Sequence, residues 1–104
     1  MSKHAALTLN PQVGGHNEEI VDALNESLSL MPDDPETWNH KGMSLRILNR
    51  DAEALEAFDK ATHLKPDFAE AWWNKGFVLF ELQRSKEGVE ALDEGARLDD
   101  LTRG

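Results

Sequence analysis

The chain has 104 residues, contains no cysteine and carries a formal net charge of −9 at pH 7. This length predicts one domain with a modest core, and the missing cysteines exclude disulfides and thiolate metal sites. The acidic balance disfavours nucleic-acid binding, which needs a cationic surface. No apolar run approaches the roughly 18 residues of a membrane span. We therefore expect a cytoplasmic protein without nucleic-acid or membrane partners.

The first residues do not fit the pattern of the rest. Within residues 1–16, Pro11 and the two glycines that follow it interrupt any long helix. Two interpretations stay open: an N-terminal strap that lies over Ile20 and Leu24, or a disordered tail. We assign residues 17–104 to the folded domain.

Five helices with short connections are predicted for the domain, and no stretch has the alternation of a β-strand. The first helix stops at Pro32. The second begins after Asp34, with a proline at its first position. Asn49, which follows the second helix, suits a left-handed backbone conformation. The capping residues that we expect are Asn17, Asp34, Asp51, Asp67 and Ser85. The five helices cover residues 17–31, 35–48, 51–64, 69–82 and 85–98.

A repeat of 34 residues organises these helices. Adding 34 to a residue number takes Trp38 to Trp72, Gly42 to Gly76 and Leu45 to Leu79, and the agreement continues through the following helix. Subtracting 34 works only for the second half of the unit. A period of this length is typical of a helix-turn-helix solenoid, so the predicted fold is all-α.

The repeated residues resemble the tetratricopeptide repeat (TPR). The family's signature is matched in order by Trp38, Gly42, Leu45, Ala54, Phe58, Ala61 and Pro66. The second copy departs from it at Gly88, Gly95 and Asp100, and each glycine is expected to cost the last helix about 0.5–1 kcal/mol relative to alanine. The resemblance covers residues 17–100 and implies about two full TPR units after a preceding half unit.

In this family the first helix of each unit lines a concave groove that holds a peptide or a helix. The resemblance therefore implies a partner-binding face, on which Phe77 and Met43 are the strongest candidates for open apolar contacts. Trp73 and Phe80 could instead pack against the neighbouring helix. The full set of candidates is Asn39, His40, Met43, Ile47, Glu70, Trp73, Asn74, Phe77, Phe80 and Glu81.

The charge of the groove predicts the kind of partner. Glu36 and Glu70 lie on its face and no cation accompanies Asn74, so acidic tails should be repelled and a basic, apolar peptide fits better. The four histidines have no metal-ligand spacing, and no catalytic set or phosphate loop is visible. We expect a protein-interaction module that is not an enzyme and needs no cofactor or metal. The alternative is a structural unit that forms a homodimer through its uncapped terminal helices.

Overall fold

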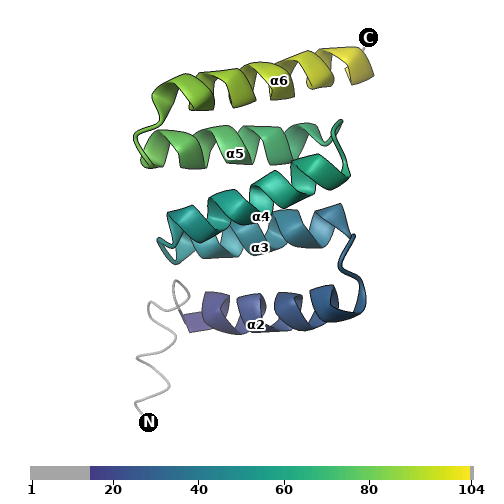
Figure 1. Ribbon diagram of the computed structural model, residues 1–104, viewed down its shortest axis with the longest axis vertical. Coiled ribbons are helices and arrows are strands. Elements are labelled where there is room, and N and C mark those ends of the chain that lie inside the picture. Colours follow the sequence, from purple (N-terminus) through teal and green to yellow (C-terminus); the bar gives the residue numbers. More distant parts are fainter. Residues whose placement is uncertain (1–14, 104) are drawn as a thin grey trace.

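The computed structural model describes residues 15–103, and these form five helices without a strand. The helices stack in chain order, from α2 at one end of the molecule to α6 at the other (Figure 1). Each packs mainly on its neighbours in the chain, and α3 and α5 also touch. The helices are α2 (Gly15–Leu30), α3 (Pro35–Ile47), α4 (Asp51–Leu64), α5 (Ala69–Glu81) and α6 (Ser85–Arg103). The predicted all-α solenoid is confirmed.

The helix ends differ from the prediction mainly at the two termini. Helix α2 begins at Gly15, two residues before the predicted start, and α6 runs to Arg103 rather than stopping near Leu98. The predicted strap or tail falls mostly on residues 1–14, which lie outside the described residues.

The start of α3 confirms the predicted cap, whereas the predicted cap of α5 is wrong. Asp34 accepts hydrogen bonds from the backbone of Glu36 and the hydroxyl of Thr37, at 3.3 and 2.7 Å. The 34-residue repeat places Phe68 at the position of Asp34, and Phe68 has no side-chain oxygen to offer. Asp67 stands one residue too early to take that role.

The starts of α4 and α6 are built alike. Asp51 is the first residue of its helix rather than its cap, and Ser85 is likewise the first residue of α6. The arginines before them, Arg50 and Arg84, each reach a glutamate three residues on through two hydrogen bonds. Before these arginines the chain turns through a left-handed residue in both units, at Asn49 (φ 63°) and Gln83 (φ 65°). The repeat therefore extends to turn geometry.

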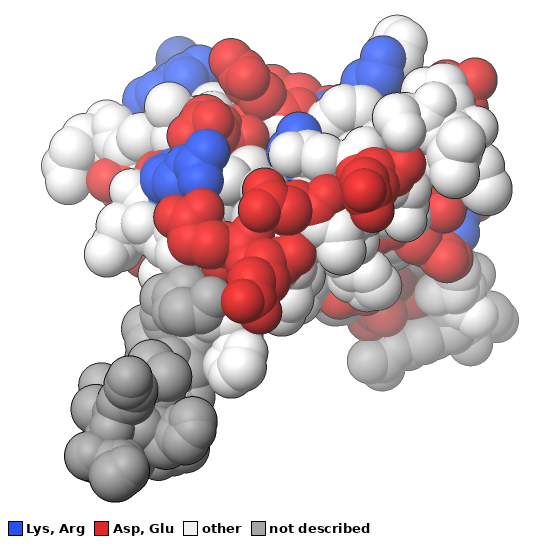
Figure 2. Space-filling model, turned by 90° about the horizontal axis from the view of Figure 1, so that it is seen from below, with Lys and Arg blue, Asp and Glu red and all other residues white. Residues whose placement is uncertain are grey.

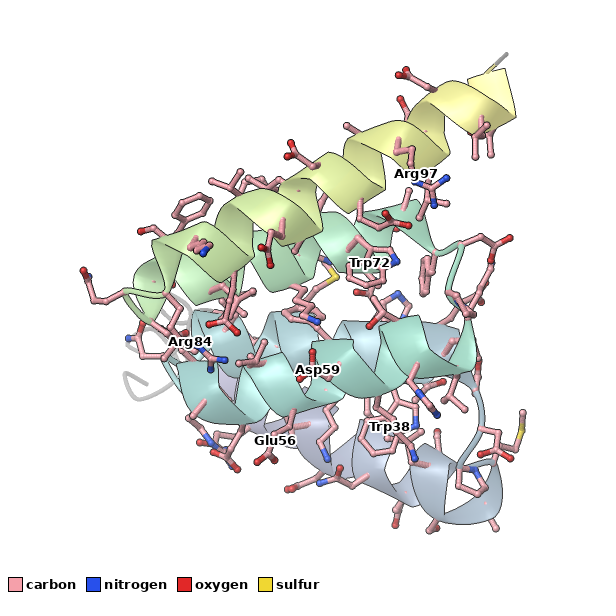
Figure 3. The ribbon with its side chains drawn as sticks, turned by 45° about the horizontal axis from the view of Figure 1, so that its top comes forward. Trp38, Glu56, Asp59, Trp72, Arg84 and Arg97 are labelled. Atoms are coloured by element: carbon pink, nitrogen blue, oxygen red, sulfur yellow. The ribbon has the colours of Figure 1, made fainter. Side chains whose placement is uncertain are left out.

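The two repeated tryptophans occupy equivalent places in the two units (Figure 3). Trp38 donates its indole N–H to the carbonyl of Pro32 at 2.7 Å, and Trp72 donates to the carbonyl of Pro66 at 2.8 Å. Both rings are half-buried. The Nζ of Lys41 lies 5.1 Å from the ring centre of Trp38, and the Nζ of Lys75 lies 5.0 Å from that of Trp72. The tryptophans thus tie each helix pair to the turn before it.

The core of the first full unit depends on a close approach of α3 and α4. Phe58 is completely buried, and a Cβ atom added at Gly42 would lie only 2.5 Å from its ring. The absence of a side chain at Gly42 therefore lets the ring of Phe58 pack directly against α3. Leu45 and Leu79 are also buried at equivalent positions, so one continuous core runs through both units.

Helix α2 buries only some of its apolar side chains. Val21 and Leu28 are buried against the rest of the molecule, whereas Ile20 is exposed and Leu24 is only half-buried. By the repeat, Ile20 corresponds to Ala54 of α4, which packs beside α3. Within residues 15–103 no helix occupies the corresponding place beside α2.

Acidic side chains gather on the α2 end of the molecule (Figure 2). Four exposed acids lie along α2 itself, and Arg50 comes within 3.5 Å of one of them. These acids are Glu18, Glu19, Asp22 and Glu26. Much of the negative charge of the chain is therefore concentrated at this end.

Candidate functional site

The residues predicted to line the groove lie on α3 and α5, and three of the apolar ones are accessible. Met43 and Ile47 on α3 are 38% and 52% exposed, and Phe77 on α5 is 45% exposed. His40 and Glu70 are also exposed. Three large apolar side chains thus share one accessible surface with polar neighbours, as at many protein contacts.

Two of the predicted residues join the helices beneath this surface. Asn39 is 2% exposed, and its carbonyl oxygen accepts a hydrogen bond from the side-chain amide of Asn74 at 3.0 Å. The amide of Asn39 also lies 3.8 Å from the sulfur of Met43. Asn39 is therefore not accessible to a partner, and its hydrogen bond with Asn74 joins α3 to α5.

The groove contains a cation that the sequence analysis missed. Arg46 lies 3.6 Å from the carboxylate of Glu81, and its guanidinium carbon is 5.7 Å from the ring centre of Phe77. Arg46 thus connects two predicted groove residues. Helical spacing could have revealed it, because Arg46 follows Met43 by three residues on α3.

The half-buried carboxylate of Asp51 lies next to Arg46 and Glu81. Burial raises the pKa of Asp51, and the neighbouring carboxylate of Glu81 raises it further, although Arg46 partly offsets both effects. Among the described residues, one oxygen of Asp51 and the Nε of Arg46 are buried without a hydrogen-bond partner. Two carboxylates, those of Asp51 and Glu81, thus share one arginine.

Trp73 and Phe80 face the neighbouring helix more than the groove. A Cβ atom added at Gly95 would overlap the indole of Trp73, and one added at Gly88 would lie 3.1 Å from the ring of Phe80. The glycines of α6 therefore make room for these two aromatic rings. Phe80 keeps an exposed edge and Trp73 is half-buried.

A charged hollow of about 410 Å³ lies on the other side of the molecule, between α4, α5 and α6. Its cations already have acidic partners: Lys75 lies 2.9 Å from Asp59, and Arg84 lies 2.7 Å from Glu87. Figure 3 shows Asp59 and Arg84 on this side. Since both cations of the hollow are already paired within the chain, the exposed apolar residues of α3 and α5 are the better candidate for a partner.

The repeat geometry and the groove agree with what sequence comparison finds. A TPR repeat family matches residues 42–83, and a second family, described as tetratricopeptide repeat, matches residues 69–100. The chain belongs to the tetratricopeptide repeat family. TPR domains are in general non-catalytic scaffolds that bind other proteins. None of the curated proteins matches the chain.

The TPR fold is also found among solved structures. A crystal structure of MamA superposes with a TM-score of 0.81 at 18% identity, over 85% of this chain and 52% of that one. MamA residues 41 to the end from Desulfovibrio magneticus RS-1 give 0.81 at 17% identity, over 97% and 64%. The structure titled MamA MSR-1 C2 gives 0.79 at 20% identity, over 88% and 52%. The chain spans about half the length of the first of these proteins, and the likeness concerns the fold alone.

No helix within residues 15–103 combines the length and the apolar character that crossing a membrane requires. In the same residues, no group of three histidine, aspartate or glutamate side chains is close enough to hold a metal ion.

Proposed function

We propose that this TPR domain is a protein-interaction module that binds a peptide or a helix along the groove of α3 and α5. The observation that carries the proposal is the exposure of Met43, Ile47 and Phe77 on one surface. Exposing these three apolar side chains to water does not stabilise the folded domain, whereas burying them against a partner would lower the free energy of the complex.

The preferred partner is basic and apolar. Glu36, Glu70 and Glu81 are exposed on the groove helices, and Arg46 already lies beside Glu81. A lysine or arginine of the partner would find carboxylates on both sides of the apolar centre. An acidic tail would be repelled by these carboxylates, because Arg46 already lies beside Glu81.

Titration of the labelled chain with basic, apolar peptides tests this proposal. We expect the largest amide shifts at Met43, Asn74 and Phe77, and we expect Phe77→Ala to weaken binding by about tenfold, since an aromatic anchor is lost. A matched control is Glu56→Gln, which changes an exposed side chain on α4 away from the groove. Shifts that cluster elsewhere, or equal binding by Phe77→Ala, would contradict the proposal.

Self-association is the second candidate. The exposure of Ile20 favours it, because the corresponding Ala54 is completely buried. The acids along α2 oppose it, since two such faces would repel each other at low salt (Figure 2). Light scattering at high micromolar protein concentration tests self-association. At about 0.5 M salt the Debye length falls to a few ångströms, so repulsion between the acids is screened. A protein that stays monomeric both there and at low salt would exclude the second candidate.

A further inference from the structure

The outer side of the last repeat unit is more apolar than the inner side to which it corresponds. Adding 34 to the residue numbers takes Asn39 to Trp73, Arg46 to Phe80 and Thr62 to Ala96. Terminal units of repeat arrays usually carry a polar outer face, because that face meets water. Here the replacements run in the opposite direction.

Burial shows the same contrast. Leu55 of α4 is 8% exposed, whereas Val89, its equivalent in α6, is 48% exposed. Val89 shares its side of the molecule with four other apolar residues of α5 and α6. We call this set the α6-end surface: Trp73, Phe80, Val89, Leu92 and Ala96.

The first unit shows what covers such a surface. Helix α5 packs on α3 and α4, burying its own Ala71 and Val78 completely. It also pairs Lys75 with Asp59 of α4 at 2.9 Å. In α6 the equivalent of Asp59 is Asp93, which is exposed. A helix that lies on α5 and α6 as α5 lies on α3 and α4 would therefore need small apolar residues and one cation placed like Lys75, to pair with Asp93.

Within residues 15–103, α6 continues past the point at which the chain turns after α4. Helix α4 ends at Leu64, and Pro66 follows it. At the corresponding point Asp100 replaces the proline, and α6 continues to Arg103. The turn that lays α5 onto α4 thus has no counterpart in α6.

We propose that the α6-end surface binds a helix of another polypeptide, in the orientation that α5 takes on α3 and α4. The partner helix carries small apolar side chains and a lysine or arginine that reaches Asp93. This surface differs from the groove, whose open residues lie on α3 and α5. The net charge of −9 favours a basic partner over a second copy of this chain.

A peptide with the sequence of residues 67–83 is a suitable probe, because it contains the helix that covers the equivalent surface. We expect it to shift the amides of Val89, Asp93 and Ala96 in the labelled full chain, and to leave Met43 unshifted. The substitution Val89→Asp should weaken this binding by about tenfold or more, because it puts a charge where an apolar side chain is to be buried. Val89 is exposed, so the variant should keep its helical circular dichroism.

A charge exchange tests the proposed contact with Asp93. The Asp93→Lys protein should bind the peptide about two- to fivefold more weakly, as expected for one exposed ion pair, and a peptide with Lys75→Glu should restore the affinity. Phe77→Ala serves as the control: it should leave this binding intact, so failure here is separable from failure of the groove proposal.

Three results would overturn the proposal. The first is the absence of any shift up to a peptide concentration of about 1 mM, the limit of weak binding. The second is a set of shifts confined to the groove. The third is a shift of Val89 and Ala96 that grows with protein concentration when no peptide is present, because it would assign the surface to a second copy.

Discussion

Gly42 allows α3 and α4 to approach, and its replacement tests how tightly the first unit is packed. An alanine there would place its Cβ 2.5 Å from the ring of Phe58, which is completely buried and has no room to move. We expect Gly42→Ala to lower the free energy of unfolding by about 1–3 kcal/mol, the usual cost of overpacking. Urea denaturation measures this, and a variant as stable as the parent would contradict the packing described here.

Gly95→Ala is the matched comparison. Its added Cβ would also overlap a ring, that of Trp73, but Trp73 is half-buried on the open side of α5 and can rotate away. The gain in helix propensity, about 1 kcal/mol, then offsets much of the clash. We expect a change within about 1 kcal/mol of the parent, clearly smaller than that of Gly42→Ala. An equal loss at both sites would show that Trp73 is as fixed as Phe58.

Asp51 gives a test in pH. Because its pKa in the folded chain lies above the ordinary value of 3.8, the folded state binds this proton more tightly than the unfolded chain does. The ionised carboxylate therefore opposes folding at neutral pH, and the opposition fades as the pH falls through the raised pKa. We expect Asp51→Asn to raise the melting temperature at pH 7 and to lose this advantage near pH 3.8.

Glu56→Gln is the control for Asp51→Asn, since Glu56 is an exposed acid on the same helix (Figure 3). It should change the melting temperature little at either pH. A loss of stability in Asp51→Asn at pH 7 would mean that attraction to Arg46 outweighs burial and the repulsion of Glu81.

At the scale of the helix, the two ends of the stack should be the least protected. Helices α2 and α6 each pack on one neighbouring helix within residues 15–103, whereas α3, α4 and α5 each pack on at least two. Amide hydrogen exchange should therefore be slowest in α4 and roughly tenfold or more faster in the last turns of α6, where opening is local. Equal protection of α4 and α6 would contradict this ranking.

The start of α3 could be predicted from sequence because two signals agreed there. Asp34 and the following proline marked it, and the structure confirms both. At the start of α5, the predicted Asp67 cap relied on its spacing from Glu70, which resembles a capping box. The repeat would have given the correct answer, because Phe68 occupies the position of Asp34.

The interior of the groove was harder to predict, since contacts between α3 and α5 depend on their spacing. The sequence pointed to Asn39 and Asn74 as surface residues, but their hydrogen bond places Asn39 beneath the surface. The spacing within α3 could have placed Arg46 beside Met43, but its contact with Glu81 joins two residues 35 apart in the chain, on different helices. No periodicity within one helix reports that contact.

At the scale of the molecule, two separate surfaces remain accessible for partners. The groove joins apolar side chains to acidic ones on α3 and α5, and the α6-end surface lies on the outer side of α5 and α6. Under both proposals, folding and binding use different faces of the same helices. Phe77→Ala and Val89→Asp separate the two surfaces.

The most direct test is selection of a random peptide library on the immobilised chain, followed by the same selection on Phe77→Ala and Val89→Asp. We expect the parent to enrich peptides that combine apolar residues with lysine or arginine, and we expect Phe77→Ala to lose the groove-binding class while Val89→Asp retains it. Enrichment of acidic peptides, or of the same peptides by the parent and by Phe77→Ala, would contradict the proposed groove.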